Sequence, residues 1–223
     1  MAKPNRRRAR SADSFKRRPG SRPPRQCILV VCEGLKTEPN YFKALCRELK
    51  LTSVEVEVVT GEGSAPISVV DSALELKHRR ERDVRKERTT KLKFDEVWCV
   101  FDRENPQDNP SFPRAVNKAT SNKLELAVST PAFEYWYLLH FIYTDKPFRD
   151  ASEVIEVLKK HIPHYEKNQD IFNRCELLER TAVAIERAAR GWSQRVDKNE
   201  RFPNSSTLVF KLVQKLQDMS QRE

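Results

Sequence analysis

Glycine is scarce in this chain, with five in 223 residues. Phosphate-binding loops of the Walker and Rossmann types need several glycines at fixed spacing, and no such spacing occurs here. Long apolar runs are also missing: no segment approaches the roughly 20 residues that cross a bilayer. The first residues contain no apolar stretch typical of a secretory signal. We therefore expect neither type of nucleotide-binding loop, no membrane partner, and a cytoplasmic location.

The five cysteines form no Cys-X-X-Cys pair. Cys27, Cys32 and Cys99 lie inside apolar runs, as reduced and packed thiols do in cytosolic proteins. His161 and His164 have no cysteine nearby, so we expect surface histidines there and not a zinc site.

Acidic residues are almost absent from residues 1–25, which contain one acid and ten lysines or arginines. Ten minus one gives +9, so nearly all of the chain's net charge of +10 belongs to this segment. It is rich in Arg, Pro and Ser and has little to bury, which predicts a disordered basic tail. Such a tail could neutralise nucleic-acid phosphates, remain solvated, or contact an acidic protein. The candidate phosphate contacts are Arg6, Arg7, Arg8, Arg17 and Arg18.

Between residues 26 and 145, short apolar runs alternate with amphipathic stretches. We expect strands at 27–32, 54–59, 94–101 and 124–128, and helices at 37–50, 67–88, up to about 121, and 133–141. Three of the runs, 27–32, 94–101 and 124–128, are mostly apolar, as in strands buried on both faces. This alternation predicts an α/β fold, a Rossmann-like three-layer sandwich around a mostly parallel sheet. Residues 77–88 mix both charge signs and are interpreted as a solvated helix face.

No strand pattern appears after residue 145. Amphipathic helices are expected at 152–160, 173–190 and 206–219, with Ser206 and Thr207 as caps of the last one. The predicted organisation is therefore a disordered tail at 1–25, an α/β core at 26–145, and a helical extension at 146–223 packed on that core.

Two of the buried runs end in acids. The first is followed by Glu33-Gly34, and the second by Asp102-Arg103-Glu104. Ligands bind at the carboxyl ends of strands in open α/β sheets. Asp102 and Glu104 alternate, so both could face one Mg²⁺ or Mn²⁺ ion, which takes one or two protein carboxylates and leaves other positions to phosphate oxygens. Glu33, Asp102 and Glu104 are the candidate catalytic and metal-binding residues. The alternative is that acids at strand ends only cap loops.

Five further residues are weaker candidates. Glu38 could reach the same ion, although an acid in a first helical turn also suits the helix dipole. Glu134 begins an apolar helix at the same edge and is a further metal-ligand candidate. Lys36 and Arg103 are candidate nucleic-acid contacts, and Lys36 could equally be solvated. His140 is expected to be packed or on the surface.

Longer stretches of the sequence resemble known protein families. A Glu-Gly after one strand and an Asp-X-Asp-like pair two strands later resemble a Toprim domain over about residues 26–128. Nearly all of the sequence after the basic tail resembles the RloB-like family. The segments that carry this resemblance are VCEGLKTEPNYF at 31–42, VFDRE at 100–104, STPAFEYWYLLHF at 129–141 and PNSST at 203–207.

The resemblance implies a Toprim fold and a Mg²⁺-dependent nuclease of prokaryotic antiviral defence, acting by abortive infection. It assigns Glu33 as the Toprim glutamate, and Asp102 with Glu104 as the metal-binding pair; many Toprim domains have a second Asp in place of Glu104. The implied substrate is DNA or RNA, tRNA included, and the implied partner is an ABC-type ATPase of the RloA or OLD kind. The chain could also form a homo-oligomer. The alternative is a non-catalytic Toprim-like module that binds nucleic acid and such an ATPase.

Overall fold

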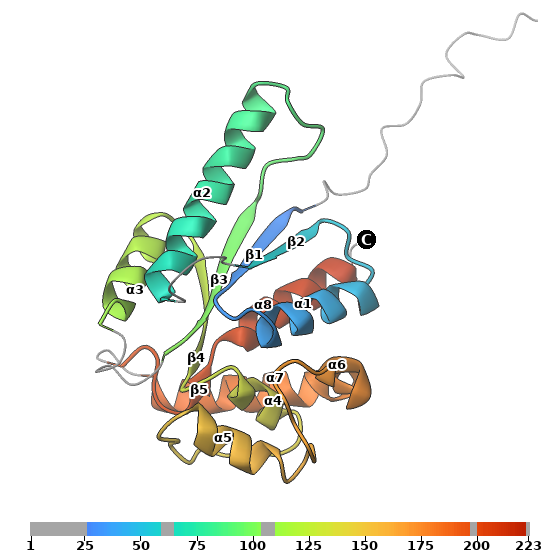
Figure 1. Ribbon diagram of the computed structural model, residues 1–223, viewed down its shortest axis with the longest axis vertical. Helices are drawn as coiled ribbons and strands as arrows, with labels where there is room; N and C mark the ends of the chain where they lie inside the picture. Colours follow the sequence, from blue (N-terminus) through green and yellow to red (C-terminus); the bar gives the residue numbers. More distant parts are fainter. Residues whose placement is uncertain (1–25, 59–64, 104–109, 197–199, 222–223) are drawn as a thin grey trace, which may run out of the picture.

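One five-stranded sheet organises the chain. The computed structural model describes residues 26–58, 65–103, 110–196 and 200–221 (Figure 1). The sheet order is β2-β1-β3-β4-β5. The strands are β1 Ile28–Cys32, β2 Val54–Val58, β3 Glu96–Asp102, β4 Glu125–Thr130 and β5 Ser206–Thr207. The first four are parallel and β5 is antiparallel to β4.

Helices cover both faces of this sheet and crowd one of its ends. They are α1 Thr37–Glu48, α2 Pro66–Arg85, α3 Phe112–Ser121, α4 Glu134–Leu139, α5 Ala151–Leu158, α6 Ile171–Arg174, α7 Leu177–Arg195 and α8 Val209–Ser220. Helices α2 and α3 lie on one face, and α1 and α8 on the other (Figure 1). Helices α4 to α7 gather beyond the carboxyl end of β4. The predicted α/β class and mostly parallel sheet are confirmed.

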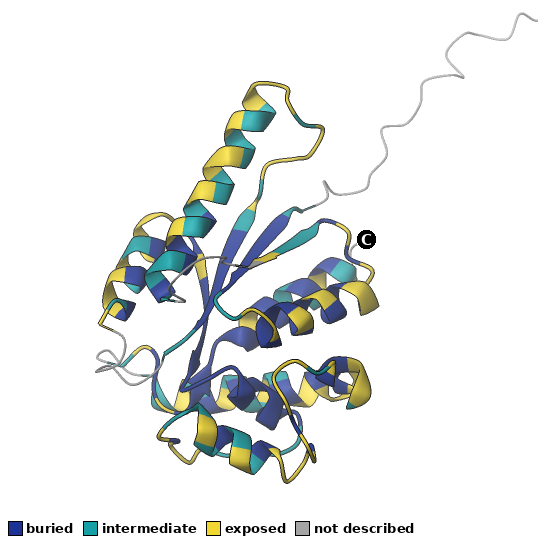
Figure 2. Ribbon diagram, in the orientation of Figure 1, coloured by how far each residue is buried: buried dark blue, intermediate teal, exposed yellow. Residues whose placement is uncertain are grey.

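The central strands are mostly dark blue in Figure 2 because their side chains are covered from both faces. Every residue of β1 is buried, as expected for an apolar run between two helical layers. The register aligns the carboxyl ends, since Cys32 pairs with Val100 and Asp102 with Ser129. Residues that follow β1 and β3 therefore emerge at one edge. No helix in the described part of the chain has the length and apolarity that a bilayer crossing requires.

The expectation of helices alone after residue 145 is wrong at one place, and one of the expected helices is divided in two. Ser206 and Thr207, expected as helix caps, form β5, and the Thr207 hydroxyl lies 2.9 Å from that of Ser129 on β4. A two-residue strand is too short to show an alternating pattern. The single helix expected at 173–190 is divided into α6 and α7, because Glu176 adopts a left-handed conformation with φ of 50°.

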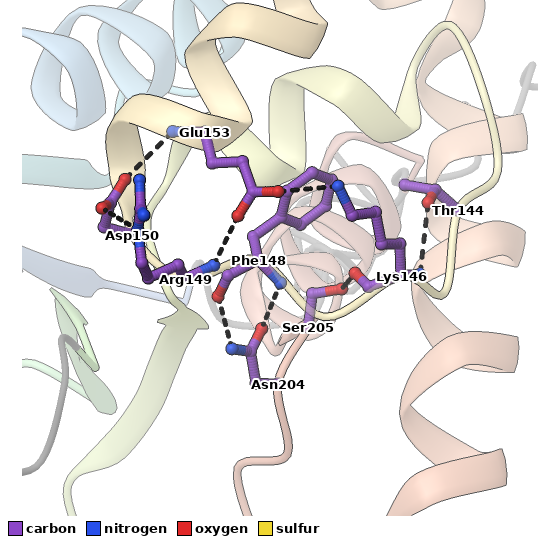
Figure 3. Close-up of polar contacts among 8 residues, drawn as sticks. All are labelled: Thr144, Lys146, Phe148, Arg149, Asp150, Glu153, Asn204 and Ser205. Atoms are coloured by element: carbon purple, nitrogen blue, oxygen red, sulfur yellow. Dashed lines mark hydrogen bonds and ion pairs between the residues drawn. The ribbon is translucent and has the colours of Figure 1, made fainter.

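The segment before β5 is fastened to the loop between α4 and α5 (Figure 3). The Asn204 side-chain amide donates to the Phe148 carbonyl at 2.5 Å and accepts from the Phe148 amide at 3.2 Å. The Ser205 hydroxyl donates to the Lys146 carbonyl at 2.8 Å. Residues beyond 145 are thus tied into the sheet, to which they contribute a strand and the covering helix α8.

Candidate active site

Glu33 and Asp102 meet where β1 and β3 end. The Glu33 amide donates to the Val100 carbonyl at 2.9 Å, which extends the ladder by one residue. In return, the Asp102 amide donates to Glu33 Oε2 at 3.1 Å. The Asp102 carboxylate accepts a hydrogen bond from the Phe133 amide, just before α4. These contacts join the two strand ends and the start of α4 in one small region.

Glu38 turns inward from the first turn of α1. Its carboxylate accepts hydrogen bonds from its own amide and from that of Gly34. A Cβ atom at Gly34 would lie 2.0 Å from Glu38 Oε2, so only glycine leaves room for this carboxylate. Glu38 therefore both suits the helix N-terminus and faces the strand-end acids, which joins the two interpretations that the sequence left open.

The acids are close enough to perturb one another. Burial, and then the charges of Glu38, Glu134 and Glu33, raise the pKa of Asp102 well above its usual value. Burial, and then the charge of Glu134, raise the pKa of Glu38. Like charges held together in this way oppose ionisation. Such clusters are common at functional sites.

Glu134 pairs with a lysine, Lys167, beside these acids. It is 1% exposed in the first turn of α4. The Tyr165 hydroxyl donates to Glu134 Oε1 at 3.2 Å, and Lys167 Nζ lies 3.4 Å from the same oxygen. Burial alone would lower the pKa of Lys167, but the charges of Glu134, Asp102 and Glu38 together raise it.

Lys167 and Tyr165 lie in residues 159–170, the segment between α5 and α6, which we call the strap. The Thr37 hydroxyl donates to the Lys167 carbonyl at 3.2 Å, so the strap is held over the start of α1. The Lys167 side chain is 59% exposed, which places its ammonium group at the rim of the site. Sequence reasoning missed both residues, because no motif surrounds them and their partners lie more than 30 positions earlier in the chain.

Aromatic packing between α1 and α4 brings Glu38 and Glu134 together. Tyr41 is fully buried on α1, and its ring centroid lies 5.7 Å from that of Phe133 and 6.2 Å from that of Trp136. Edge-to-face pairs of this kind add about 0.5–1.5 kcal/mol each beyond their buried area. His140, expected to be packed or on the surface, is packed here, with its ring centroid 6.3 Å from that of Tyr41.

Other predicted residues lie apart from this cluster. Lys36 is exposed immediately before α1. The Arg103 guanidinium contacts Glu200, donates to the Phe202 carbonyl at 2.5 Å, and lies over the Phe112 ring at 5.5 Å. Its placement therefore favours a structural role over the predicted nucleic-acid contact. Outside the described residues lie Glu104, Arg6, Arg7, Arg8, Arg17 and Arg18.

The donor chemistry of the cluster suits a hard cation such as Mg²⁺ or Mn²⁺, since it consists of carboxylate oxygens without thiol or imidazole. Glu33, Glu38, Asp102 and Glu134 are the described residues that could hold it. However, no three His, Cys, Asp or Glu side chains within the described ranges are arranged as a ready set of metal ligands. The described carboxylates thus have the donor type that a divalent cation prefers, and Lys167 is paired with one of them, Glu134.

Comparisons with known proteins identify the family. No curated protein and no solved structure matches the chain. The family model described as RloB-like protein matches residues 28–216, which include both strand-end acids, α4 and the strap. The chain therefore belongs to the RloB-like protein family.

Proposed function

We propose that this chain is a metal-dependent nuclease of the Toprim type, hydrolysing phosphodiester bonds in DNA or RNA. The observation that supports the proposal is the convergence of Glu33, Glu38, Asp102 and Glu134 at one edge of the sheet. Glu104 belongs to the proposed ligand set on sequence grounds. A bound Mg²⁺ or Mn²⁺ would polarise the phosphodiester and stabilise charge on the attacking or leaving oxygen.

The chain's own residues orient this site. The Phe133 amide fixes the Asp102 carboxylate, and the Gly34 amide fixes that of Glu38. The Tyr165 hydroxyl holds Glu134. In the proposal, the exposed Lys167 ammonium offers a donor and a positive charge to a non-bridging phosphate oxygen.

Glu33→Gln tests the proposal directly. The Gln oxygen can still accept the hydrogen bond from the Asp102 amide, so the fold should be retained. We expect purified wild-type protein with Mg²⁺ or Mn²⁺ to cleave DNA or RNA, and the variant to cleave about 100-fold more slowly or less. Glu125→Gln, an exposed acid at the opposite end of β4, is the matched control and should cleave normally. Normal cleavage by Glu33→Gln at unchanged thermal stability would show that the assigned site is wrong.

The second candidate is a non-catalytic module that binds nucleic acid and an ATPase. It is favoured by the lack of a ready ligand set among described residues and by the pairing of Lys167 with Glu134. Calorimetric titration with Mn²⁺ separates the two candidates. Binding that Asp102→Asn abolishes supports the nuclease, whereas no binding by the wild-type protein supports the module.

The role in antiviral defence and the ABC-type ATPase partner rest on the family resemblance and belong to the same proposal. Co-purification of the tagged chain with the product of a neighbouring gene tests the partner. Sequencing of the nucleic acid cleaved by that complex would then distinguish DNA from RNA substrates, tRNA included. Recovery of the chain without an ATPase under conditions that preserve complexes would refute the partner.

A further inference from the structure

The second half of α2 leaves the body of the protein. Buried residues of α2 end at Ala73, and no residue from Leu74 to Phe94 is buried. Figure 2 shows this end of the helix in yellow and teal, standing beyond the sheet together with the chain that returns to β3. We call residues 77–93 the arm. A polar helix with so little to bury must be stabilised by other contacts.

Arg80 braces the arm. Its guanidinium lies 2.6 Å from Glu55 on β2 and donates to the Leu92 carbonyl at 3.1 Å. It also lies over the Phe94 ring at 4.2 Å. Lys91 adds a second contact to Glu55 at 3.1 Å. The helix and its return are thus fixed to each other and to the sheet, so the arm presents its outer side chains on a stable support.

The structure shows which charged side chains of the arm are exposed. Nine basic residues minus three acidic ones give the arm a net charge of +6. Arg79, Arg82 and Arg85 recur every third residue and are exposed, whereas Glu81 and Asp83 between them are half-buried at the sides. Within the solvated face expected at 77–88, the structure thus contains a row of exposed cations, while Glu87 is also exposed.

The basic tail enters the described structure at the foot of the arm. The Cys27 amide donates to Asp95 Oδ2 at 2.8 Å, and the Asp95 amide donates to the Cys27 carbonyl at 2.8 Å. Residues 1–25 carry +9 in the sequence and connect to the protein at this point. The arm therefore lies at the amino ends of the strands, opposite the edge that holds Glu33 and Asp102 (Figure 1).

We propose that the arm binds the phosphate backbone of nucleic acid, as an anchor remote from the carboxylate site. The identification of the bound polyanion as a nucleic acid rests on the proposed function. The inference that the arm binds a polyanion rests on the charge and position of the arm. At 1.5 Å per residue, the exposed row lies about 20–28 Å along α2 from Pro66, the end of the helix nearest the carboxylate edge. Exposed arginines contact phosphates regardless of sequence.

The test compares two variants, one that lacks the exposed arginines of the arm and one that lacks three basic residues elsewhere. The first variant is Arg79→Gln/Arg82→Gln/Arg85→Gln. The control is Lys43→Gln/Arg47→Gln/Lys50→Gln, exposed residues on α1 and just after it with the same change in charge. Binding of a labelled DNA duplex and of an RNA hairpin by full-length protein is measured in EDTA over a range of salt concentrations. EDTA prevents cleavage, so binding is measured apart from catalysis.

We expect the arm variant to bind at least about tenfold more weakly and its salt slope to fall by about 2–3, because each lost duplex phosphate contact removes about 0.9. The control should change the slope by less than about one contact. An unchanged slope in the arm variant, or an equal loss in both variants, would overturn the proposal. So would arm-dependent binding of polyglutamate in preference to both nucleic acids, since that result would indicate an acidic protein partner.

This test is independent of the proposed catalysis. If Glu33→Gln shows that the carboxylates cleave nothing, while the arm variant still loses affinity, the anchor stands and the nuclease fails. If Glu33→Gln abolishes cleavage, while the arm variant binds normally, the nuclease stands and the anchor fails.

Discussion

The buried histidine beside the site makes the fold sensitive to acid. His140 is 2% exposed, and its Nδ1–H donates to the Trp136 carbonyl at 2.9 Å. Burial, with smaller contributions from the charges of Arg180 and Arg187, lowers its pKa from 6.5 to about 4. The folded protein therefore keeps this ring neutral over a range in which the unfolded chain protonates it.

The size of the effect follows from these two values. The difference between 6.5 and 4 corresponds to about 3 kcal/mol, at 1.36 kcal/mol per pH unit. Because the folded pKa is the lower one, the unfolded state binds the proton first as the pH falls. The contribution of the neutral His140 to the free energy of unfolding is fully present above pH 6.5. It is lost as the pH falls from 6.5 to about 4 and does not change below that. Between neutrality and about pH 4.5 the loss is about 2 kcal/mol.

Urea unfolding at these two pH values measures the loss, with His140→Phe as the comparison. The phenyl ring keeps most of the packing against Tyr41 and Trp136 but cannot take up a proton. The variant should be less stable at neutral pH, because it loses the hydrogen bond to Trp136, and should lose about 2 kcal/mol less than wild type on acidification. An equal loss in both proteins would refute the reasoning, since it would place the acid sensitivity in other groups.

Three further changes test the site and the tail. Gly34→Ala should displace the Glu38 carboxylate, because the new Cβ would lie 2.0 Å from its Oε2, and so weaken Mn²⁺ binding in calorimetry; unchanged affinity would remove Glu38 from the ligand set. Lys167→Met should lower stability in EDTA by about 1 kcal/mol and enlarge the stabilisation by Mg²⁺ in thermal unfolding; an unchanged Mg²⁺ effect would show that the ammonium does not compete with the ion. Deletion of residues 1–25 should weaken binding to a DNA duplex and reduce its salt slope; an unchanged slope would assign the tail another role.

The strands and their terminal acids could be predicted because their signals are local. An apolar run that ends in an acid identifies both a buried strand and the residue at its carboxyl end, as for Glu33 and Asp102. β5 could not be predicted, because two residues carry no periodicity. The contact of the strap with the site could not be predicted either. Lys167 lies near Glu134 only because α4, α5 and the loops between them fold the chain back.

The direction in which a charged side chain points could not be predicted from the sequence either. The run at 77–88 contains both signs, and its composition alone favours a solvated face. The structure shows which side chains are exposed, with Arg79, Arg82 and Arg85 among them, while Arg80 pairs with Glu55. The orientation of Arg103 toward residues 200–202 is likewise set by tertiary contacts, which the sequence around Arg103 does not indicate.

The opposed placement of the two charged regions has a consequence for the order of events. The carboxylates at one edge, paired among the described residues with Lys167, would repel a phosphate backbone to the extent that they are ionised and no divalent cation is bound there. The arm at the other end attracts the same backbone without a metal. Nucleic acid should therefore bind first through the arm in EDTA, with a steep salt dependence, and engage the carboxylate edge only when Mg²⁺ or Mn²⁺ reverses the local charge. On this view the arm governs affinity and the carboxylates govern cleavage, so variants in one region should leave the property of the other unchanged.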